Sequence, residues 1–290
     1  MKKLLITGAS GFLGWYLCQL AQAKWNVFGT YHSHTVDIPD TTQLKLDLTD
    51  FDRLKDTLIT LKPDAVIHAA AMSQPNQCQE NPDRSYLINV IASWNLAGLC
   101  ADLHIPFVFT SSELVFDGKN PPYQESDPVC PINLYGEQKV AAETGILDRH
   151  SDAVICRMPL MFGVVPHAQS FIQPFIERIR TGQVLNLFTD EIRTPVSGTS
   201  AAKGILLALE KAKGLIHLGG YDRLSRHEMG LMLVEVLQIA NANLNPCKQA
   251  DVPMPAPRAK DVSMDSSLAF SLGYQPARMR EELERMRDRL

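Results

Sequence analysis

The sequence predicts an α/β fold in which helices cover both faces of a doubly wound parallel sheet. Over the first 157 residues, short β-favouring runs alternate with longer amphipathic segments of helical length. Strands that alternate with helices form βαβ units, and their strands are parallel. A glycine-rich turn also stands between the first strand and the first helix. With 290 residues, 45% of them hydrophobic, the chain is long enough for a large core and more than one domain.

The expected strands of the first half are apolar runs bounded by turn residues. They are Leu4–Thr7, Val27–Tyr31, Gln43–Leu46, Ala65–His68, Phe107–Thr110 and Val154–Arg157. The helices expected between them are Phe12–Ala23, Phe51–Leu61, Asp83–Leu103 and Tyr135–Asp148. Before the helix at Phe51, Thr49 and Asp52 have the spacing of a capping box, and Asp50 is the alternative N-cap.

The turn after the first strand has the pattern of a phosphate-binding loop. Gly8, Gly11 and Gly14 are each three residues apart, which departs by one residue from the commonest dinucleotide fingerprint. Gly8 permits the tight turn, Gly11 lets the backbone approach a pyrophosphate, and Gly14 lets the helix pack closely. The free N–H groups at the helix N-terminus then favour an anion. The sequence therefore predicts a Rossmann-type dinucleotide-binding domain.

After Pro159 the pattern becomes less regular. The elements expected there are helices at Ser170–Thr181, Thr199–Lys211, Arg226–Ala240, Ser266–Leu272 and Met279–Arg289, and strands at Val184–Phe188 and Leu215–Leu218. A proline-rich stretch, Pro246–Pro257, separates the last helices. We expect a dinucleotide-binding domain over residues 1–157, to which residues 192–218 return. Residues 158–191 and 219–290 are expected to form a smaller substrate-binding lobe.

Charge and composition argue against several classes of protein. The 28 basic and 32 acidic side chains give a net charge of −4 without a Lys/Arg block, so neither nucleic acid nor an anionic membrane is an expected partner. No apolar run approaches the ~18 residues of a membrane helix, and the run after Met1-Lys2-Lys3 stops too early for a secretion signal. The six cysteines lack the spacing of a zinc site or a disulfide framework. We therefore expect no metal and a reducing, cytoplasmic location.

Tyr135 and Lys139 form the candidate catalytic pair. Residues four apart share one face of a helix, so the phenol and the ammonium group can converge. A free tyrosine has a pKa near ~10, and a nearby cation favours its phenolate form. We therefore expect Lys139 to lower the pKa of Tyr135 and to make it an effective acid–base group at neutral pH. The pair follows the fifth strand of a sheet whose first turn is a phosphate loop, which argues against a chance match.

These motifs resemble the extended branch of the short-chain dehydrogenase/reductase superfamily, whose members modify nucleotide sugars. The run from Thr7 to Gly14 matches the TGxxGxxG loop of that branch, Asp47-Leu48 matches a pair beside the adenine, and Ala69–Ala71 matches its run of small residues. The resemblance implies a cofactor site with Tyr135, Lys139 and the following further residues: Gly8, Ser10, Gly11, Phe12, Leu13, Gly14, Thr30, Tyr31, His32, Ser33, Asp47, Leu48, Ala69, Ala70 and Ala71.

The resemblance also implies a third catalytic residue. The segment Ser111–Phe116 resembles the S-[ST]-x-x-V-[FY] run of the family, whose second hydroxyl residue is catalytic, and this residue is Ser112 here. The alternative for Ser112 is a helix cap. Asn89 matches a position at which the superfamily often has Asn, and a polar surface residue is the alternative interpretation.

Within this branch the chain looks most like the dTDP-4-dehydrorhamnose reductases. The motifs that carry this likeness are Val115–Gly118, Asn133–Gly136, Thr194-Pro195, Arg258–Asp265 and Leu272–Tyr274. Leu114, Ala259 and Ser200 depart from the usual Tyr, Pro and Asp of those reductases. The likeness implies hydride transfer from a nicotinamide to a sugar C4 carbonyl, with Tyr135 protonating the alkoxide, Lys139 holding the ribose and Ser112 orienting the carbonyl. The departures concern the sugar substrate rather than the dinucleotide chemistry.

Two alternatives stay open at this point. A 4-epimerase or dehydratase would regenerate its cofactor in each cycle, but a dehydratase usually has an acidic pair, and only Glu113 follows Ser112. A non-catalytic NADP-binding regulatory subunit is the other alternative, since the β subunit of methionine adenosyltransferase looks like a relative of these reductases. The presence of Ser112, Tyr135 and Lys139 favours catalysis.

The second strand predicts which cofactor is used. It ends without the carboxylate that binds the ribose 2′-hydroxyl in NAD-specific sites, and Thr30, His32 and Ser33 can contact a 2′-phosphate. No Arg is near in the sequence, so we expect NADPH to be preferred or equal to NADH.

A small-molecule substrate, a nucleotide sugar, is the expected partner, and a homodimer stays open. Arg193 and Arg258 are expected to bind its diphosphate, because guanidinium groups pair well with phosphate. Glu113 and Phe116 are further expected substrate contacts.

Overall fold

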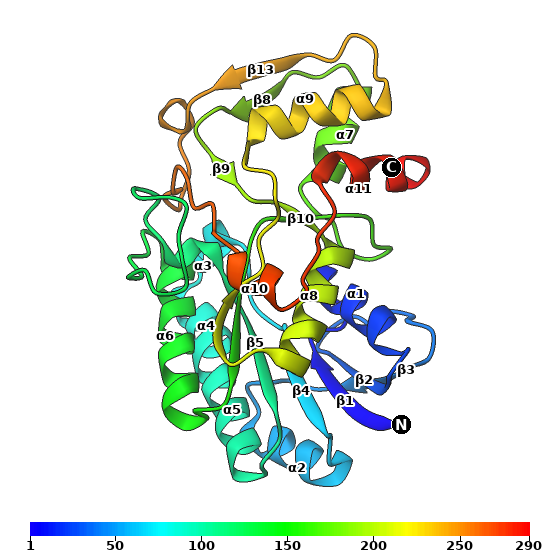
Figure 1. Cartoon of the computed structure of the whole chain (residues 1–290), viewed down its shortest axis with the longest axis vertical. Helices are drawn as coiled ribbons and strands as arrows, with labels where there is room; N and C mark the ends of the chain where they lie inside the picture. Colours follow the sequence, from blue (N-terminus) through cyan, green and yellow to red (C-terminus); the bar gives the residue numbers. More distant parts are fainter.

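The computed structural model describes residues 1–290 and confirms the predicted α/β fold (Figure 1). Seven parallel strands form the main sheet, in the order β11-β6-β5-β4-β1-β2-β3. Their bounds are β1 (Lys2–Thr7), β2 (Trp25–Tyr31), β3 (Thr41–Lys45), β4 (Ala65–His68), β5 (Phe107–Ser112), β6 (Val154–Met158) and β11 (Gly214–His217). The strand order reverses beside β1, and ligands of open α/β sheets bind at the carboxyl ends of the strands around such a point.

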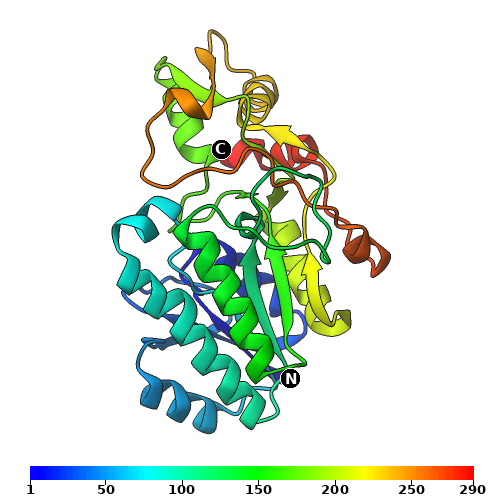
Figure 2. The same ribbon diagram turned by 90° about the vertical axis from the view of Figure 1, so that its left-hand side faces the viewer.

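Helices cover both faces of this sheet (Figure 2). One face carries α1 (Phe12–Ala21) and α8 (Gly198–Lys211), and the other carries α2 (Phe51–Leu61), α5 (Ala92–Asp102) and α6 (Leu134–Arg149). Side chains alternate along each strand, so Leu4 and Ile6 face the core with α1 and α8, whereas Leu5 faces the core with α2 and α5. Of the two start signals proposed for α2, Asp50 is the N-cap, and it accepts a hydrogen bond from the Arg53 N–H.

The long helix expected at Asp83–Leu103 is divided. A short helix α4 (Pro82–Tyr86) leads into a π-helical turn η1 (Leu87–Ile91) and then into α5. Within the π turn, Asn89 is buried, accepts a hydrogen bond from the Met72 N–H (2.8 Å) and donates to the Met72 carbonyl (3.0 Å). The surface interpretation of Asn89 is therefore wrong, because its side chain holds the loop after β4. The sequence analysis also missed α3 (Pro75–Glu80) in that region.

The second part of the chain contains small sheets of two strands each. The pairs are β7 (Met161–Phe162) with β10 (Val196–Ser197), β9 (Ile192–Arg193) with β12 (Leu224–Ser225), and β8 (Leu185–Phe188) with β13 (Leu244–Cys247). Strand β13 was not predicted, because Pro246 interrupts its pattern, yet it pairs with β8 at the end of the molecule farthest from the main sheet (Figure 1).

The helices of this part surround a separate core. They are α7 (Ile172–Arg180), α9 (Arg226–Leu237) and α11 (Met279–Met286), with α10 (Ser267–Ser271) nearer the main sheet. Single 3₁₀ turns are η2 (Glu113–Val115), η3 (Gln249–Asp251) and η4 (Arg287–Arg289). Helix α9 begins with a capping box between Ser225 and Glu228. No helix combines the length and the apolar character needed to cross a membrane.

Candidate active site

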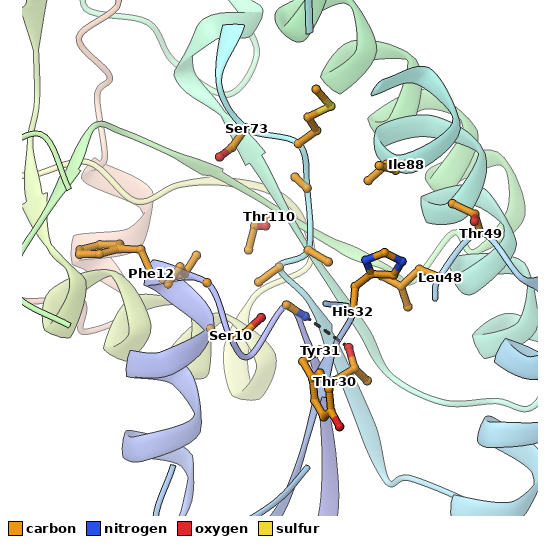
Figure 3. Close-up of a pocket in the computed structure, with 18 of the residues that line it drawn as sticks. Ser10, Phe12, Thr30, Tyr31, His32, Leu48, Thr49, Ser73, Ile88 and Thr110 are labelled. Carbon is orange, nitrogen blue, oxygen red and sulfur yellow. Dashed lines mark hydrogen bonds between the residues drawn. The ribbon is translucent and has the colours of Figure 1, made fainter. Parts of the chain in front are cut away.

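A cavity of about 490 Å³ lies at the carboxyl ends of the central strands (Figure 3). Every residue that was expected to bind the cofactor lines this cavity, with the exception of Ser33, which is exposed. The expected residues that line it are Gly8, Ser10, Gly11, Phe12, Leu13, Gly14, Thr30, Tyr31, His32, Asp47, Leu48, Ala69, Ala70, Ala71, Tyr135 and Lys139. The loop glycines and the proposed catalytic pair thus share one cavity.

The glycine loop forms the cradle that its spacing predicts. Gly8 has a φ of +74°, a conformation that only glycine adopts without strain, and the Gly11 N–H donates to the Gly8 carbonyl (2.9 Å). A Cβ atom at Gly14 would overlap the Gly8 carbonyl, so this glycine lets α1 approach the loop itself. No side chain caps the N-terminus of α1 at Gly11, which leaves backbone donors for an anion. These features fit the pyrophosphate of a dinucleotide.

A carboxylate and an imidazole face each other at another part of the cavity. The His32 Nε2 atom lies 3.4 Å from the Asp47 carboxylate. Hydrogen bonds from the side chain and the N–H of Thr49 lower the pKa of Asp47. The second strand itself ends without a carboxylate, but the segment that follows β3 brings Asp47 beside the end of β2.

The sequence around His32 contains no Arg, but the fold brings one to the same cavity. Arg84 lines the cavity from α4, 52 residues after His32 in the sequence. One indication of a role for Arg84 was present in the sequence, namely its place in the expected helix Asp83–Leu103, which follows the strand Ala65–His68.

Tyr135 and Lys139 are buried on α6, but their electrostatics differ from the expectation. Lys139 Nζ donates to the Thr110 carbonyl (2.9 Å) and lies 4.5 Å from the centre of the Phe109 ring. Burial lowers the pKa of Lys139 to about 8, and the nearby Glu143 carboxylate opposes this shift. Burial raises the pKa of Tyr135, and Lys139 is not among the groups that lower it. The expected lowering of the Tyr135 pKa by Lys139 is therefore wrong for this structure, and burial keeps the Tyr135 phenol neutral.

A buried ion pair supports α6, the helix that carries Tyr135 and Lys139, from behind. One turn after Lys139, Glu143 accepts hydrogen bonds from Arg157 Nε (3.0 Å) and Nη2 (2.7 Å). The Ser111 hydroxyl donates to the same carboxylate (2.5 Å). These contacts join α6 to β5 and β6 one helical turn after Lys139. The sequence analysis missed both members of this pair.

Ser112 lies at the end of β5 and has two roles in the geometry. Its hydroxyl accepts a hydrogen bond from the Leu114 N–H (3.2 Å), so it caps η2, as the alternative interpretation proposed. The same hydroxyl interacts with Tyr135 and lowers the pKa of its phenol, although burial outweighs this effect. Ser112 is almost buried and does not line the cavity.

Two expected substrate contacts are core residues instead. Phe116 has no exposed surface and stacks on Tyr123 with 4.1 Å between ring centres, so it cannot touch a substrate here. Arg193 is 3% exposed, and its Nε lies 3.2 Å from Glu113 Oε1. Arg193 also donates to the carbonyls of Ile192 and Ala259, which leaves little donor capacity for a diphosphate. The expectations for Phe116 and Arg193 are corrected accordingly.

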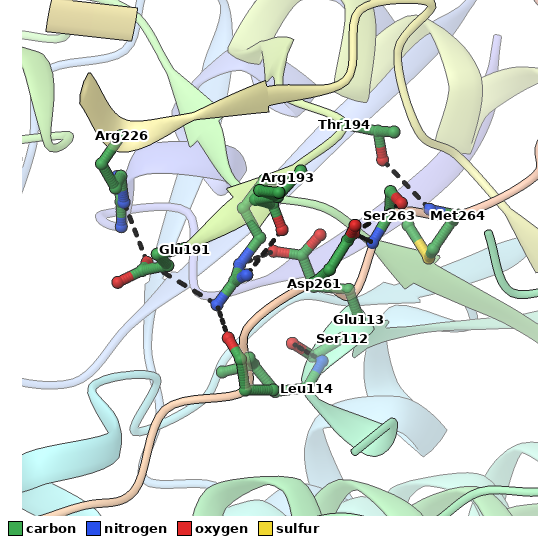
Figure 4. Close-up of polar contacts among 12 residues, drawn as sticks. Ser112, Glu113, Leu114, Glu191, Arg193, Thr194, Arg226, Asp261, Ser263 and Met264 are labelled. Carbon is green, nitrogen blue, oxygen red and sulfur yellow. Dashed lines mark hydrogen bonds and ion pairs between the residues drawn. The ribbon is translucent and has the colours of Figure 1, made fainter. Parts of the chain in front are cut away.

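Glu113 and Arg193 belong to a larger cluster of charges between the two parts of the chain (Figure 4). Glu191 lies 3.6 Å from Arg193 Nη2 and 2.9 Å from Arg226 Nε. Burial raises the pKa of Glu113 to about 8, against the effect of Arg193. Burial raises the pKa of Glu191 too, but Arg226 and Arg193 outweigh it and keep the pKa low.

The cluster has a cationic surplus. Burial lowers the pKa of Arg258, and both Arg226 and Arg193 repel its charge. Arg226 Nη1 and Arg258 Nε are buried without a hydrogen-bond partner. Three guanidinium groups therefore stand against one ionised carboxylate and one that is largely protonated at neutral pH. The sequence analysis missed Arg226, which carries no signal beyond its place at the start of a helix.

Comparisons with known proteins agree with this geometry. The family model described as RmlD substrate binding domain matches residues 1–290. The methionine adenosyltransferase 2 subunit beta of Xenopus laevis is 28% identical over 282 residues, which cover 94% of this chain and 83% of that protein. A Haloferax volcanii protein described as "probable low-salt glycan biosynthesis reductase Agl14" is 29% identical over 287 residues, 96% of this chain and 95% of that protein.

Solved structures show the same fold. A hypothetical dTDP-4-dehydrorhamnose reductase from Sulfolobus tokodaii has a TM-score of 0.84 and 33% identity, and the match covers 93% of this chain and 94% of that one. A dTDP-4-dehydrorhamnose reductase from Bacillus anthracis in complex with NADP has a TM-score of 0.86 and 23% identity over the whole of both chains. With the family model matching every residue, the chain belongs to the RmlD substrate binding domain family, within the extended short-chain dehydrogenases/reductases.

Proposed function

We propose that this NAD(P)-dependent oxidoreductase reduces the C4 carbonyl of a nucleotide sugar. The observation that carries the proposal is the shared cavity, in which Tyr135 and Lys139 lie with the glycine loop Gly8–Gly14. The nicotinamide cofactor, when bound there, supplies the hydride. The similarity of the whole chain to dTDP-4-dehydrorhamnose reductases supports this class of substrate.

Three side chains of the protein divide the remaining work. Tyr135 donates a proton to the alkoxide that forms at C4, and its raised pKa keeps the phenol protonated until then. Lys139 retains its positive charge below its pKa of about 8 and has donors left for a ribose hydroxyl after its bond to the Thr110 carbonyl. Ser112 adjoins Tyr135 and orients the sugar carbonyl.

The second part of the chain holds the nucleotide diphosphate in this proposal. We assign residues 158–191 and 219–290 to this task, and residues 1–157 with 192–218 to cofactor binding. Arg258 and Arg226 supply the unpartnered guanidinium atoms, and guanidinium binds phosphate through paired, charge-assisted hydrogen bonds. Arg193 acts indirectly, because its bond to Glu113 holds the segment that follows Ser112.

Oxidation of the reduced cofactor tests the proposal directly. Purified protein is mixed with NADPH or NADH and a 4-keto nucleotide sugar, and loss of the reduced nicotinamide absorbance is followed. We expect turnover with at least one dTDP- or UDP-linked 4-keto sugar. Absence of turnover with all of them, while the cofactor binds, would exclude the reductase.

Replacement of Tyr135 by Phe tests the acid. We expect Tyr135→Phe to reduce turnover by at least roughly 10²-fold, the usual effect of losing a general acid, because the variant lacks the phenol proton that is donated to the alkoxide. Cofactor affinity should hardly change, since the glycine loop is untouched. Tyr221→Phe, at an exposed tyrosine far from the cavity, is the matched control. Normal activity of Tyr135→Phe would remove this residue from the mechanism.

A cofactor-binding subunit without activity is the second candidate function. The similarity to methionine adenosyltransferase 2 subunit beta over 94% of this chain favours it. The presence of Ser112, Tyr135 and Lys139 opposes it, since a binding subunit needs no proton donor. Cofactor binding without turnover on any 4-keto nucleotide sugar would favour this candidate over the reductase.

A further inference from the structure

Arg84 is a cation of the cavity that neither the glycine loop nor the proposed catalytic residues explain. It lies on α4 and lines the cavity together with Leu87 and Ile88 of the following π turn. Its side chain is exposed, and its guanidinium group forms neither an ion pair nor a hydrogen bond within the chain. A free guanidinium at the edge of a cavity is available to a ligand.

The charges of the cavity leave a role for such a cation. A nicotinamide dinucleotide carries at least two negative charges on its pyrophosphate, and the glycine loop offers these only backbone N–H groups and Ser10. Besides Arg84, the charged side chains of the lining are His32, Asp47 and Lys139. Asp47 is an anion and pairs with His32, whereas Lys139 is buried and bonded to the Thr110 carbonyl. Arg84 is therefore the one lining side chain with a full positive charge and no partner.

The backbone that carries Arg84 is fixed to the rest of the site. The adjacent Ser85 hydroxyl accepts a hydrogen bond from Gln138 Nε2 of the catalytic helix α6 (2.7 Å). Asn89, in the next turn, is bonded to Met72 in the cavity wall. Figure 3 shows Ile88, of the same helical segment, across the cavity from Phe12 at the start of α1. The exposed, unpaired side chain of Arg84 on this fixed base can thus close over a ligand that lies on the glycine loop.

We propose that Arg84 binds a phosphate group of the nicotinamide dinucleotide and closes the cavity over it. The inference rests on cofactor binding at the proposed site. The two sources of phosphate are the pyrophosphate, which NADH and NADPH share, and the 2′-phosphate of NADPH alone. A guanidinium suits either group, because it forms paired, charge-assisted hydrogen bonds with phosphate oxygens.

Calorimetric titration of the full-length protein with NADPH and with NADH tests this role. We expect Arg84→Ala to weaken binding of NADPH by roughly tenfold or more, as for loss of a charge-assisted hydrogen bond. Arg84→Lys should recover part of the affinity. The affinity of Arg84→Ala should also depend less on salt concentration than that of the wild type, because salt screens the lost attraction. A purely structural role would not change this salt dependence.

The pattern across cofactors identifies the phosphate. Equal weakening of NADPH and NADH assigns Arg84 to the pyrophosphate, and weakening of NADPH alone assigns it to the 2′-phosphate. Arg285→Ala, at an exposed arginine on α11 outside the cavity, is the matched control and should bind like the wild type. Unchanged affinity and salt dependence in Arg84→Ala, while the wild type binds cofactor, would overturn this inference alone. A wild-type protein that binds neither cofactor would overturn the proposed function as well.

Discussion

Two buried glutamate–arginine pairs flank the proposed catalytic residues, and they differ in how completely their carboxylates are bonded, whereas Arg157 Nη1 of the first pair also lacks a hydrogen-bond partner. The Glu143 carboxylate accepts two hydrogen bonds from Arg157 and one from Ser111. Glu113, in contrast, pairs with Arg193 through one 3.2 Å contact of its Oε1 atom, and its Oε2 atom has no hydrogen-bond partner. The first pair joins elements of the main sheet, whereas the second joins the end of β5 to β9.

This difference decides how fully the cost of burying each carboxylate is compensated. A bidentate arginine with a further hydroxyl donor compensates the cost of burying a carboxylate, and a single arginine contact does so only in part. Burial therefore raises the pKa of Glu113 to about 8. The well-bonded pair lies beneath Lys139 as support, and the poorly bonded pair follows Ser112 at the proposed substrate site.

The largest expected effect comes from breaking the well-bonded pair. Arg157→Met leaves Glu143 buried without its cation, so we expect the free energy of unfolding to fall by about 3–5 kcal/mol. Urea denaturation measures this loss. Arg280→Met breaks an exposed pair with Glu235 and should have a much smaller effect. Similar small losses in both variants would show that the buried pair contributes no more than a surface pair.

The poorly bonded pair should make stability depend on pH. The raised pKa means that folded Glu113 keeps a proton that the unfolded chain releases, between the ordinary pKa of 4.5 and about 8. The free energy of unfolding from this group is therefore largest at low pH and falls as pH rises through about 8, by at most about 1.4 kcal/mol per pH unit. Unfolding curves across this range should be steeper in pH for the wild type than for Glu113→Gln. Parallel curves would contradict the raised pKa.

A smaller effect is expected from Arg258, which lies in the same charge cluster as Arg193 but has an unpaired guanidinium atom. Arg258 has a free Nε, so Arg258→Ala should raise the KM for the nucleotide sugar about tenfold, as for loss of one charge-assisted hydrogen bond, with cofactor affinity unchanged. Steady-state kinetics against both substrates measures this effect, with the exposed Arg287→Ala as the control. An unchanged KM would remove Arg258 from the substrate site.

The smallest expected effect concerns an exposed pair, His32 and Asp47. The His32 imidazole and the Thr30 hydroxyl can contact the 2′-phosphate of NADPH, although the negative charge of Asp47 repels this phosphate. We therefore expect NADPH to bind as well as NADH or better. Parallel titrations with the two cofactors measure the ratio of their affinities. At least tenfold tighter binding of NADH would contradict this expectation.

Much of the cofactor side of the molecule could be predicted because its signals are local. Gly8 and Gly14 are required by a turn and a close approach within a few residues of each other. Tyr135 and Lys139 share a helix face whatever surrounds them. The missed elements lack such signals: Pro246 conceals β13, and the π turn at Leu87–Ile91 has a helical pattern on either side.

The parallel sheet, the glycine loop and the Tyr135/Lys139 pair could all be predicted from the order of the residues, because backbone geometry imposes these patterns on neighbouring residues. The partners and the burial of the charged side chains became known only from the folded chain. Arg193 forms an ion pair with Glu113, 80 residues away in the chain, and is therefore not available to a ligand. Arg84, in contrast, lines the cavity without an ion-pair partner. The physical reason is that the burial and pairing of a charge depend on segments that only folding brings together.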